Sequence, residues 1–350
     1  MPSSTSSSRG ASSRGAARGA APAGPWGRTW LVALAAALLG LGGWEACWRA
    51  RGFAPALPDD ARLWVQERSR ASSGSRDTVV LLGSSIVQAA VDLDLYARES
   101  GGPEPIQLGL TGSSPLPILE DLAADPRFVG IAIAEVSPLG LFDATDTSEA
   151  LPRAMLQHER AARVGPGQGS EARLRSLVEE YAVFRLSVLA PAYLAQLALH
   201  RDLPRVNPLR MGRDRAIRFD FSERTTLVPP ALGRAAHGLA PVVSGAAFEQ
   251  VLERMAAATR AIRQRGGVVA LLSLECDGPY RKEVARRYPL GRYWAPLVDR
   301  SGALPLDLAA APELRGIRCP DGVHIDAGSR AAFTAVLARE VTAGVTRPRR

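Results

Sequence analysis

The chain has 350 residues, 46% of them hydrophobic and 22% charged, which is enough for one large globular domain or one domain with an insertion. The net charge of +8 comes almost entirely from arginine, because Lys282 is the only lysine, and the arginines are spread along the chain. A nucleic-acid-binding surface would cluster its basic residues with aromatic ones, so we expect no nucleic-acid partner.

The N-terminal end predicts a membrane anchor. Residues 1–28 are rich in Ser, Ala, Gly and Arg and contain no acid, so we expect a disordered cytoplasmic tail that cannot bury a core. Residues 29–48 follow, uncharged from Thr29 to Trp44 and with tryptophan near both ends, which predicts a transmembrane helix. The alternative is a cleaved signal peptide, but the long N-terminal region and the lack of an Ala-x-Ala site favour an uncleaved anchor.

The charges on either side of this helix predict its orientation. Only Arg49 and Arg51 follow it closely, with acidic residues beyond them, whereas four arginines precede it: Arg9, Arg14, Arg18 and Arg28. The positive-inside rule therefore predicts a single-pass protein of the cytoplasmic (inner) membrane, with its N-terminus in the cytoplasm and its main domain extracytoplasmic.

Beyond a linker with a short helix, residues 49–77, apolar segments of strand length alternate with helical patterns. The expected strands are 78–82, 106–108, 129–136, 268–274 and 305–308. The expected helices are 87–100, a segment that ends near 122, 247–265 and 327–341. This alternation predicts an α/β domain over residues 78–345, with a parallel sheet and helices on both of its faces.

The middle of this domain, residues 145–245, departs from the alternation. It holds one strong helical pattern, residues 174–199, which Pro191 should kink or break, followed by an irregular stretch rich in Pro and Arg. We interpret it as a mainly helical insertion. Its apolar side chains could belong to the core, to a lid or to a surface lying on the membrane, and the first two are favoured: Tyr181, Phe184, Leu186 and Leu189.

The domain is organised around residues 79–86, Val-Val-Leu-Leu-Gly-Ser-Ser-Ile. A buried strand leads here through Gly83 straight into a helix, so Ser84 and Ser85 lie at the carboxyl end of the strand. A serine in this place has an exposed hydroxyl and unused backbone N–H groups beside it, as α/β enzymes present a nucleophile. The alternative is that these serines only cap the helix.

A candidate base lies near the end of the chain. Asp321 and His324 are three residues apart in a loop before the last helix. There the carboxylate can orient one imidazole nitrogen while the other nitrogen takes a proton from a serine hydroxyl. Loops of this kind gather at the carboxyl edge of a parallel sheet, so Ser85, Asp321 and His324 are our candidate catalytic residues. The alternative is a chance pair, although the other histidines lie in the insertion without an acid in a comparable position: His158, His200 and His237.

Three segments occur in a characteristic order: Gly-Ser-Ser between a strand and a helix, a glycine loop after the second strand, and Asp-x-x-His before the last helix. In this order they resemble the SGNH hydrolase superfamily, also called GDSL esterases. Within it, the chain is most similar to the membrane-anchored branch that includes cell-envelope O-acyl transfer proteins. Residues 83–86 are similar to the first block of the family, residues 107–112 to the second, and residues 321–324 to the last. The resemblance covers about 70–345 and implies a three-layer α/β/α, flavodoxin-like domain. It also implies an oxyanion hole made by the backbone N–H groups of Ser85 and Gly112.

The chain departs from the family pattern after the third strand. The family carries an Asn there that donates to the oxyanion, whereas residues 134–138 read Ala-Glu-Val-Ser-Pro. Ser137 is a candidate substitute, and Glu135 could point into the site, cap the strand or pair with an arginine. Ser84 and Gln107 likewise stand where Asp and Asn are usual. The loss of one oxyanion donor can lower a rate by about 10²–10³.

The resemblance implies a serine esterase or O-acyltransferase that acts on acyl esters of cell-envelope glycans or lipid-linked glycans. It implies no cofactor and no metal, and the candidate partner is another envelope acyl-transfer protein. The missing Asn keeps open a weak or inactive module that binds glycan or scaffolds an envelope complex. A third alternative is an unrelated α/β domain, in which Ser85 and His324 would not be neighbours.

Four residues after the fourth strand have more than one interpretation. Arg281 and Trp294 could grip a sugar or an anionic group, or they could be surface residues on a helix. Cys276 and Cys319 could form a disulfide in an exported domain or remain free thiols.

Overall fold

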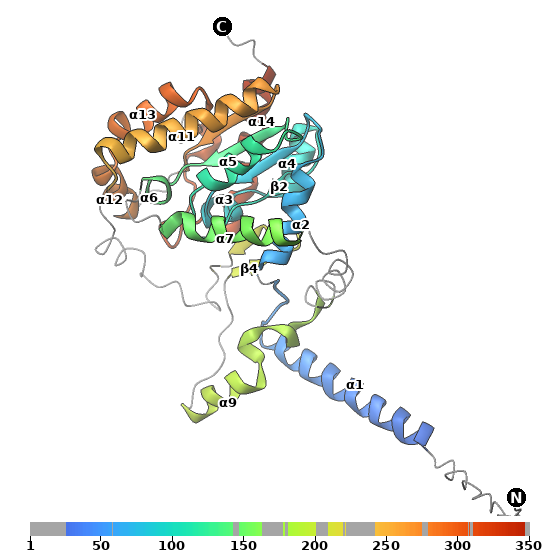
Figure 1. Ribbon diagram of the computed structural model, residues 1–350. Coiled ribbons are helices and arrows are strands. Elements are labelled where there is room, and N and C mark those ends of the chain that lie inside the picture. Colours follow the sequence, from blue (N-terminus) through green and yellow to red (C-terminus); the bar gives the residue numbers. More distant parts are fainter. Residues whose placement is uncertain are drawn as a thin grey trace, which may run out of the picture. The chain divides into compact units, whose positions relative to one another are not determined.

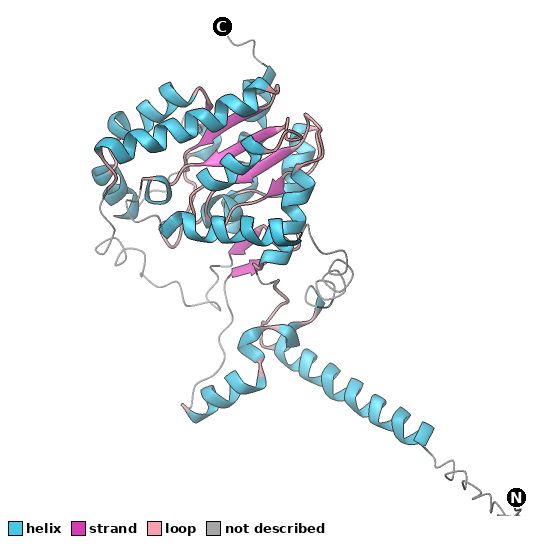
Figure 2. Ribbon diagram, viewed as in Figure 1, coloured by secondary structure: helices cyan, strands magenta, loops and turns pink. Residues whose placement is uncertain are grey.

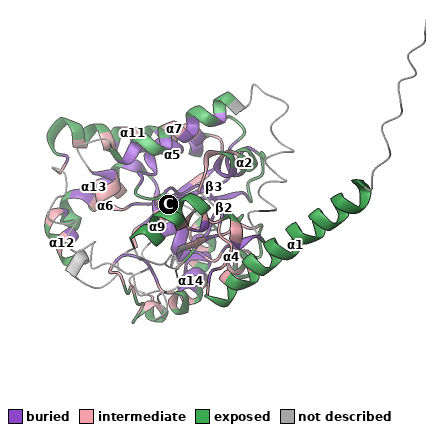
Figure 3. Ribbon diagram, turned by 90° about the horizontal axis from the view of Figure 1, so that it is seen from below, coloured by how far each residue is buried: buried purple, intermediate pink, exposed green. Residues whose placement is uncertain are grey.

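The computed structural model describes residues 26–57, 59–142, 147–162, 178, 181–200, 209–219, 221, 242–274, 279–306, 308 and 311–346. Residues 1–25, most of the tail expected to be disordered, lie outside this range. The chain divides into two compact units after Cys47. The described residues of the first unit belong to helix α1 (Trp26–Ala50), whose last three residues fall in the second unit. Helix α1 starts three residues before the expected position, and none of its residues is buried (Figures 1 and 3). By length and composition alone, α1 could cross a membrane.

The second unit is built on a five-stranded parallel sheet with the strand order β2-β1-β3-β6-β7 (Figure 2). Its strands lie at the predicted places and are up to three residues shorter: β1 (Val79–Leu82), β2 (Ile106–Gln107), β3 (Ile131–Glu135), β6 (Val268–Leu272) and β7 (Leu304–Leu306). The chain leaves β1 toward β2 on one side and returns to β3 on the other. A crevice is expected where the order reverses, at the carboxyl ends of β1 and β3.

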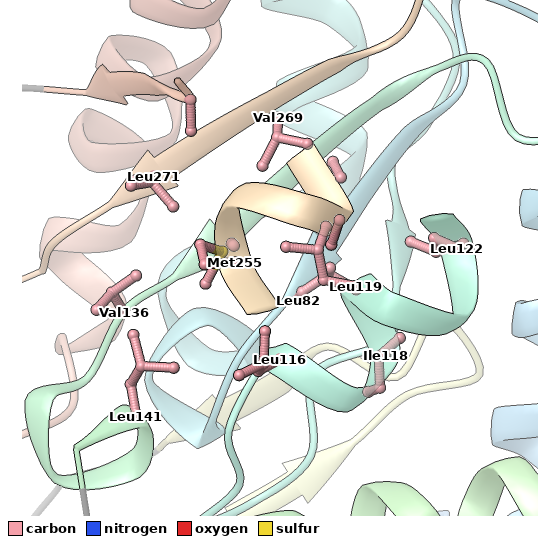
Figure 4. Close-up of a cluster of buried hydrophobic side chains, with 14 of the residues drawn as sticks. Leu82, Leu116, Ile118, Leu119, Leu122, Val136, Leu141, Met255, Val269 and Leu271 are labelled. Atoms are coloured by element: carbon pink, nitrogen blue, oxygen red, sulfur yellow. The ribbon is translucent and has the colours of Figure 1, made fainter. Parts of the chain in front are cut away.

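Alternate side chains of the strands point to opposite faces of the sheet, and each face packs in its own hydrophobic core. Val80 and Leu82 belong to the first, which is covered by α2 (Ala61–Ala71), α5 (Leu116–Ala124), α11 (Gly245–Gln264) and α13 (Leu290–Ser301) (Figure 4). Val79 and Leu81 belong to the second, which is covered by α3 (Ser85–Ala90), α4 (Leu93–Ser100) and α14 (Ala327–Thr346). Because both faces are covered, the strands read as continuous apolar runs.

Helix α2 extends the sheet domain into the segment expected to be a linker. Its Trp64 is fully buried in the first core and donates a hydrogen bond from Nε1 to the carbonyl of Leu108, at 3.1 Å. Asp60 caps the helix by accepting hydrogen bonds from two backbone N–H groups. The folded domain therefore begins well before residue 78.

The helix expected over residues 87–100 is two helices. Helix α3 ends at Ala90, and Asp92 then caps α4 by accepting a hydrogen bond from the Leu95 N–H at 3.0 Å. The Asp92 N–H donates in turn to Thr334 on α14, at 2.9 Å. A capping residue inside an apolar helical pattern thus marks a break that periodicity alone does not reveal.

The helical pattern expected over residues 174–199 is broken at Pro191, as expected, but its described part before Pro191 is not one continuous helix. Residues 183–189 form two short 3₁₀ turns, η1 (Val183–Arg185) and η2 (Ser187–Leu189), and helix α9 (Pro191–Leu199) begins only at Pro191. The residue before a proline is forced toward extended conformations, and Ala190 is extended, with ψ of 136°. Proline suits the first position of a helix because its missing N–H would be unpaired there anyway.

The described part of the insertion is mostly helical, with one hairpin. Helix α7 (Thr147–Ala162) packs on α2 and α5 and contributes buried Met155 and Leu156 to the first core, so the insertion begins as part of the domain. An antiparallel hairpin, β4 (Leu209–Met211) with β5 (Ile217–Phe219), was not expected. Its sequence alternates apolar and polar residues from Ile217 to Phe221, which is a strand signal in a stretch we interpreted as irregular. The remaining described helices are α6 (Pro138–Leu141), α12 (Pro279–Arg287) and the 3₁₀ turn η5 (Pro312–Leu314).

Candidate active site

The turn after β1 requires a glycine. Gly83 has φ of +138°, and a Cβ added to it would lie 2.5 Å from Oε2 and 2.7 Å from Cβ of Glu135. Ser84 and Ser85 follow at the carboxyl end of the strand. The interpretation as a helix cap applies to Ser84, whose Oγ accepts from the Ile86 N–H at 3.2 Å. Ser85 is the first residue of α3. The Ser85 hydroxyl is therefore not needed for capping.

Ser85, His324 and Asp321 form one chain of hydrogen bonds. The distance from Ser85 Oγ to His324 Nε2 is 2.9 Å, and the distance from His324 Nδ1 to Asp321 Oδ2 is 2.6 Å. Ser85 and His324 are 239 residues apart in the sequence and meet at the sheet edge where β1 ends. The structure thus makes Ser85 and His324 neighbours, which an unrelated domain with a chance motif would not require.

The loop before α14 holds Asp321 rigidly. Its Oδ1 accepts hydrogen bonds from the backbone N–H groups of Val323 and His324, at 2.9 and 2.8 Å, while Oδ2 faces the imidazole. Burial opposes ionisation of this carboxyl, but the hydrogen bonds from His324 and Val323 outweigh it and hold its pKa below the usual value. Cys319, two residues earlier, is disulfide-bonded and Cys47 is free, while Cys276 lies outside the described residues.

This geometry fits proton transfer from the serine. An ionised Asp321 accepts the proton on Nδ1, so the hydrogen-bond network assigns the acceptor lone pair of the neutral ring to Nε2, which faces the Ser85 hydroxyl. The His324 side chain is about nine-tenths buried, which limits competition from water. A hydroxyl placed in this way can attack an electrophilic carbon while the ring takes its proton.

Glu135 lies directly behind the nucleophile turn. It is the last residue of β3, is 1% exposed, and its Oε2 accepts hydrogen bonds from both the backbone N–H and the hydroxyl of Ser84, at 2.8 and 2.9 Å. Its other carboxyl oxygen has no hydrogen-bond partner in the described part of the chain. Burial raises the pKa of Glu135 to about 7, although the Ser84 hydrogen bonds and the nearby His324 act in the opposite direction. Of the three interpretations for Glu135, the described contacts place it against the serine pair and not with an arginine.

Gly112 lies in the loop that follows β2. The Leu110 N–H donates to the Gly83 carbonyl at 2.8 Å, which fixes this loop beside the nucleophile turn, and the Ser113 N–H donates to the Leu110 carbonyl at 3.1 Å. Gly112, with φ of +68°, is the third residue of that turn, as a type II turn requires. Within the described residues, neither the Gly112 N–H nor the Ser85 N–H has a hydrogen-bond partner.

Ser137, the other candidate oxyanion donor, is the N-cap residue of α6 and lies two residues after Glu135. Its backbone carbonyl accepts from the Gly140 and Leu141 N–H groups, but its side chain makes no capping hydrogen bond. The residue is half-buried. The hydroxyl is thus uncommitted to the helix, and the described contacts do not join it to Ser85.

The two candidates for substrate binding are not brought together with the catalytic candidates in the described contacts. Trp294 lies on α13, half-buried against the first core. This contact supports the interpretation that Trp294 is a packing residue on a helix. Arg281 lies on α12, and its side chain is outside what the structure describes. Groups of three or more His, Cys, Asp or Glu side chains fit to hold a metal are likewise absent among the described residues.

The hairpin of the insertion supplies two site residues that the sequence analysis missed. The ring of Phe219 stacks on the ring of His324, with centroids 4.3 Å apart and an interplanar angle of 22°, and Phe221 stacks on Phe219 in turn. Arg215 anchors the hairpin: it is fully buried, donates to the carbonyls of Gln107 and Gly109 at 2.7 and 3.0 Å, and pairs with Asp59 at 2.5 Å. The alternation of Ile217, Phe219 and Phe221 was the available signal for the hairpin, whereas nothing in the sequence singled out Arg215 among many arginines.

Comparison of the chain with models of known protein families, with curated proteins and with solved structures gives no match. The function is therefore inferred from the geometry of the site.

Proposed function

We propose that the chain is a serine ester hydrolase or O-acyltransferase of the SGNH type, with Ser85 as nucleophile, His324 as base and Asp321 as the residue that orients the base. The observation that carries the proposal is the hydrogen-bond chain from Ser85 Oγ through both ring nitrogens of His324 to Asp321. Serine, imidazole and carboxylate in this order are the recurrent arrangement for acyl transfer, and they are recognised by geometry and not by sequence position.

The fold around these residues supports the SGNH assignment. Numbered along the chain within the sheet, the strand order is 2-1-3-4-5, which is the flavodoxin-like order. Ser85 follows the strand at which this order reverses, and the His324 loop meets it at the same edge. Ligands of doubly wound sheets bind at that point, so the candidate nucleophile lies where the fold favours a substrate.

In the proposed reaction, Ser85 Oγ attacks the carbonyl carbon of an ester while His324 Nε2 takes the hydroxyl proton. Asp321 stabilises the imidazolium that forms, and His324 then gives the proton to the leaving alcohol as the acyl–serine bond remains. Water or a second hydroxyl attacks this acyl-enzyme and regenerates Ser85, which gives hydrolysis or transfer. The partnerless N–H groups of Ser85 and Gly112 are the proposed donors to the oxyanion.

We place the substrate in the cell envelope. α1 would hold the protein in the inner membrane, and the charges around it favour an extracytoplasmic domain. Acyl esters on envelope glycans or on lipid-linked glycans would then be within reach, and an envelope acyl-transfer protein is the proposed partner. The chemistry needs no cofactor.

A second candidate is a weak or inactive SGNH-like module that binds glycan. The observation in its favour is Glu135, a buried acid at the end of β3, close to where the family carries an Asn that donates to the oxyanion. An ionised carboxylate in that region would oppose a developing negative charge. The two candidates differ in whether Ser85 is activated, so one experiment separates them.

The experiment is labelling of the full-length protein, in lipid nanodiscs, with a fluorophosphonate probe that reacts with activated serines. We expect the parent to be labelled and Ser85→Ala and His324→Ala to lose the label. Ser84→Ala is the matched control, because it removes the neighbouring hydroxyl but leaves the hydrogen bonds among Ser85, His324 and Asp321 in place.

Retention of the label in Ser85→Ala would show that the probe reacts elsewhere and would reject Ser85 as nucleophile. A folded parent that does not react at all would reject the esterase and favour the binding module. Folding of each variant is compared by its thermal unfolding midpoint.

A further inference from the structure

Helix α9 (Pro191–Leu199) is apolar on all sides. Its sequence is Pro-Ala-Tyr-Leu-Ala-Gln-Leu-Ala-Leu, and no charged residue occurs from position 186 to position 199. A helix that is hydrophobic all round belongs either in a protein core or in a membrane, because at a protein surface one of its apolar faces would be exposed to water. α9 therefore has to be placed in one of these two environments.

Among the described residues, α9 is not part of a protein core. None of the nine residues of α9 is buried, Leu199 is 82% exposed and Tyr193 is 43% exposed. The ordinary helices of the sheet domain, such as α11 and α14, each bury one face in a hydrophobic core. α9 lacks such a face, although its composition is more apolar than theirs.

A small cluster connects α9 to the end of the candidate membrane helix. Leu194 of α9 and Trp48 both pack against one cluster of buried side chains, which consists of Phe53 and, from the 3₁₀ turns, Val183 and Leu189. Trp48 lies in the last turn of α1, and its ring meets that of Phe53 edge to face at 5.3 Å. Arg49 on the same turn donates to the carbonyl of Tyr181 at 2.7 Å. The exposed helix is thus attached to the residues at which the chain would leave a bilayer.

We propose that α9 is a second membrane-contacting element, which lies in the interface of the bilayer that α1 crosses, with its side chains among the lipid acyl chains. An uncharged stretch of 10–14 residues is too short to span a bilayer and is typical of an interfacial or re-entrant segment when it is not a core helix. The nine residues of α9 extend only ~13 Å, whereas the hydrocarbon region is ~30 Å thick.

The surrounding residues fit this position. Trp48 and Tyr193 are the aromatic types that favour the membrane–water interface. Basic residues border the segment at Arg49, Arg51 and Arg185, where they can meet lipid phosphates. The proposal does not depend on the reaction at Ser85, since it rests on α9 and on the contacts of its segment with Trp48 and Arg49.

The test uses the full-length chain in nanodiscs, with Cys47→Ser to remove the free thiol and an environment-sensitive fluorophore on one introduced cysteine. Leu199→Cys and Tyr193→Cys report on α9. The controls are Leu290→Cys and Val345→Cys, on α13 and α14, which replace apolar residues that are 59% and 38% exposed in the sheet domain. Labelling of the Cys47→Ser parent sets the background, and the discs are compared with and without lipids that carry a nitroxide on the acyl chain.

We expect blue-shifted emission at both α9 positions and loss of that emission in nitroxide discs, with water-like, unquenched emission at both controls. A blue shift without nitroxide quenching would show that protein covers α9 and would overturn the proposal. Water-like emission at Leu199→Cys would overturn it as well, as would equal quenching at the controls. Failure of the chain to co-elute with lipid discs also counts against a membrane contact.

Discussion

Two neighbouring segments of the insertion, the β4–β5 hairpin and α9, use apolar residues in opposite ways. The β4–β5 hairpin has buried Met211 and Ile217 and is joined to the sheet domain by Arg215, so that Phe219 reaches His324. α9 is more apolar than the hairpin, yet it buries no residue. Apolar content therefore does not decide whether a segment joins the protein core. A buried polar anchor with several partners fixes the hairpin, and α9 has no comparable anchor among its described contacts.

The same difference separates α3 from α9. α3 is a six-residue helix in which five residues are buried, and its cap, Ser84, is held by Glu135. α9 starts at a proline with no side-chain cap. At the sheet edge, the hydrogen bonds of Ser84 with Glu135 and with the Ile86 N–H fix the position of the apolar helix α3. In our proposal, α9 needs no such polar contacts because the lipid bilayer positions it.

The largest effect should come from the contact that orients the base. Asp321→Asn cannot accept the Nδ1 proton as a carboxylate does, so the ring favours the wrong tautomer, and the rate of Ser85 labelling should fall about 10⁴-fold. The control is Asp326→Asn in the same loop, where the carboxylate accepts from the Ser329 N–H at 2.8 Å and pairs with Arg318 at 3.9 Å. The second-order rate constant of fluorophosphonate labelling measures both. Equal rates for the parent and Asp321→Asn would remove Asp321 from the mechanism.

A smaller, structural effect should follow when the hairpin loses its anchor. Arg215→Ala leaves the Asp59 carboxylate and the carbonyls of Gln107 and Gly109 without their partner. Loss of one partner of a buried pair costs about 3–5 kcal/mol. Arg218→Ala is the control on the same hairpin, because Arg218 is exposed and its pair with Asp214 is worth about 0–1 kcal/mol. Thermal unfolding midpoints of the full chain should separate the two variants clearly. Equal midpoints would mean that Arg215 does not anchor the hairpin.

Much of the sheet edge could be predicted from the sequence because it rests on local patterns. A strand followed by Gly83, and an acid three residues before His324, place three side chains on loops whose position a parallel sheet dictates. The hairpin could not be placed in this way, because its position depends on Arg215 meeting residues that lie 156 and 108 positions away. The expected break of the 174–199 pattern at Pro191 is confirmed, but the helical period of its apolar residues did not reveal the two 3₁₀ turns that precede the extended Ala190.

The pH dependence of stability should identify the buried acid behind the serine pair. The pKa of Glu135 is about 7 in the folded protein and near 4.5 when it is unfolded, so folding favours the protonated form. Its contribution is complete below pH 4.5 and is lost as pH rises through about 7. Between pH 5 and 8 the parent should therefore lose about 2–3 kcal/mol more stability than Glu135→Gln, which cannot ionise.

The control for this measurement is Glu149→Gln. Glu149 is also buried, but hydrogen bonds from Arg254 and Arg153 outweigh burial and hold its pKa below the usual value. Its titration is complete below pH 5, so the variant should be less stable while keeping the pH slope of the parent. Unfolding in urea at pH 5, 6.5 and 8 measures all three proteins. An unchanged slope in Glu135→Gln would mean that Glu135 is ionised throughout this range.

The smallest effect should come from the aromatic ring that the insertion adds to the site. Phe219 covers His324 at 4.3 Å, and such ring pairs contribute about 0.5–1.5 kcal/mol beyond the area they bury. Phe219→Leu keeps an apolar side chain but removes the stacking surface, so the labelling rate of Ser85 should fall about 3- to 10-fold. Phe221→Leu is the control, because Phe221 stacks on Phe219 and not on the imidazole. If both variants react at the rate of the parent, the hairpin only covers the site. If Phe219→Leu alone is slower at an unchanged unfolding midpoint, the insertion positions the base. The candidate site is then built by the sheet domain and the insertion together.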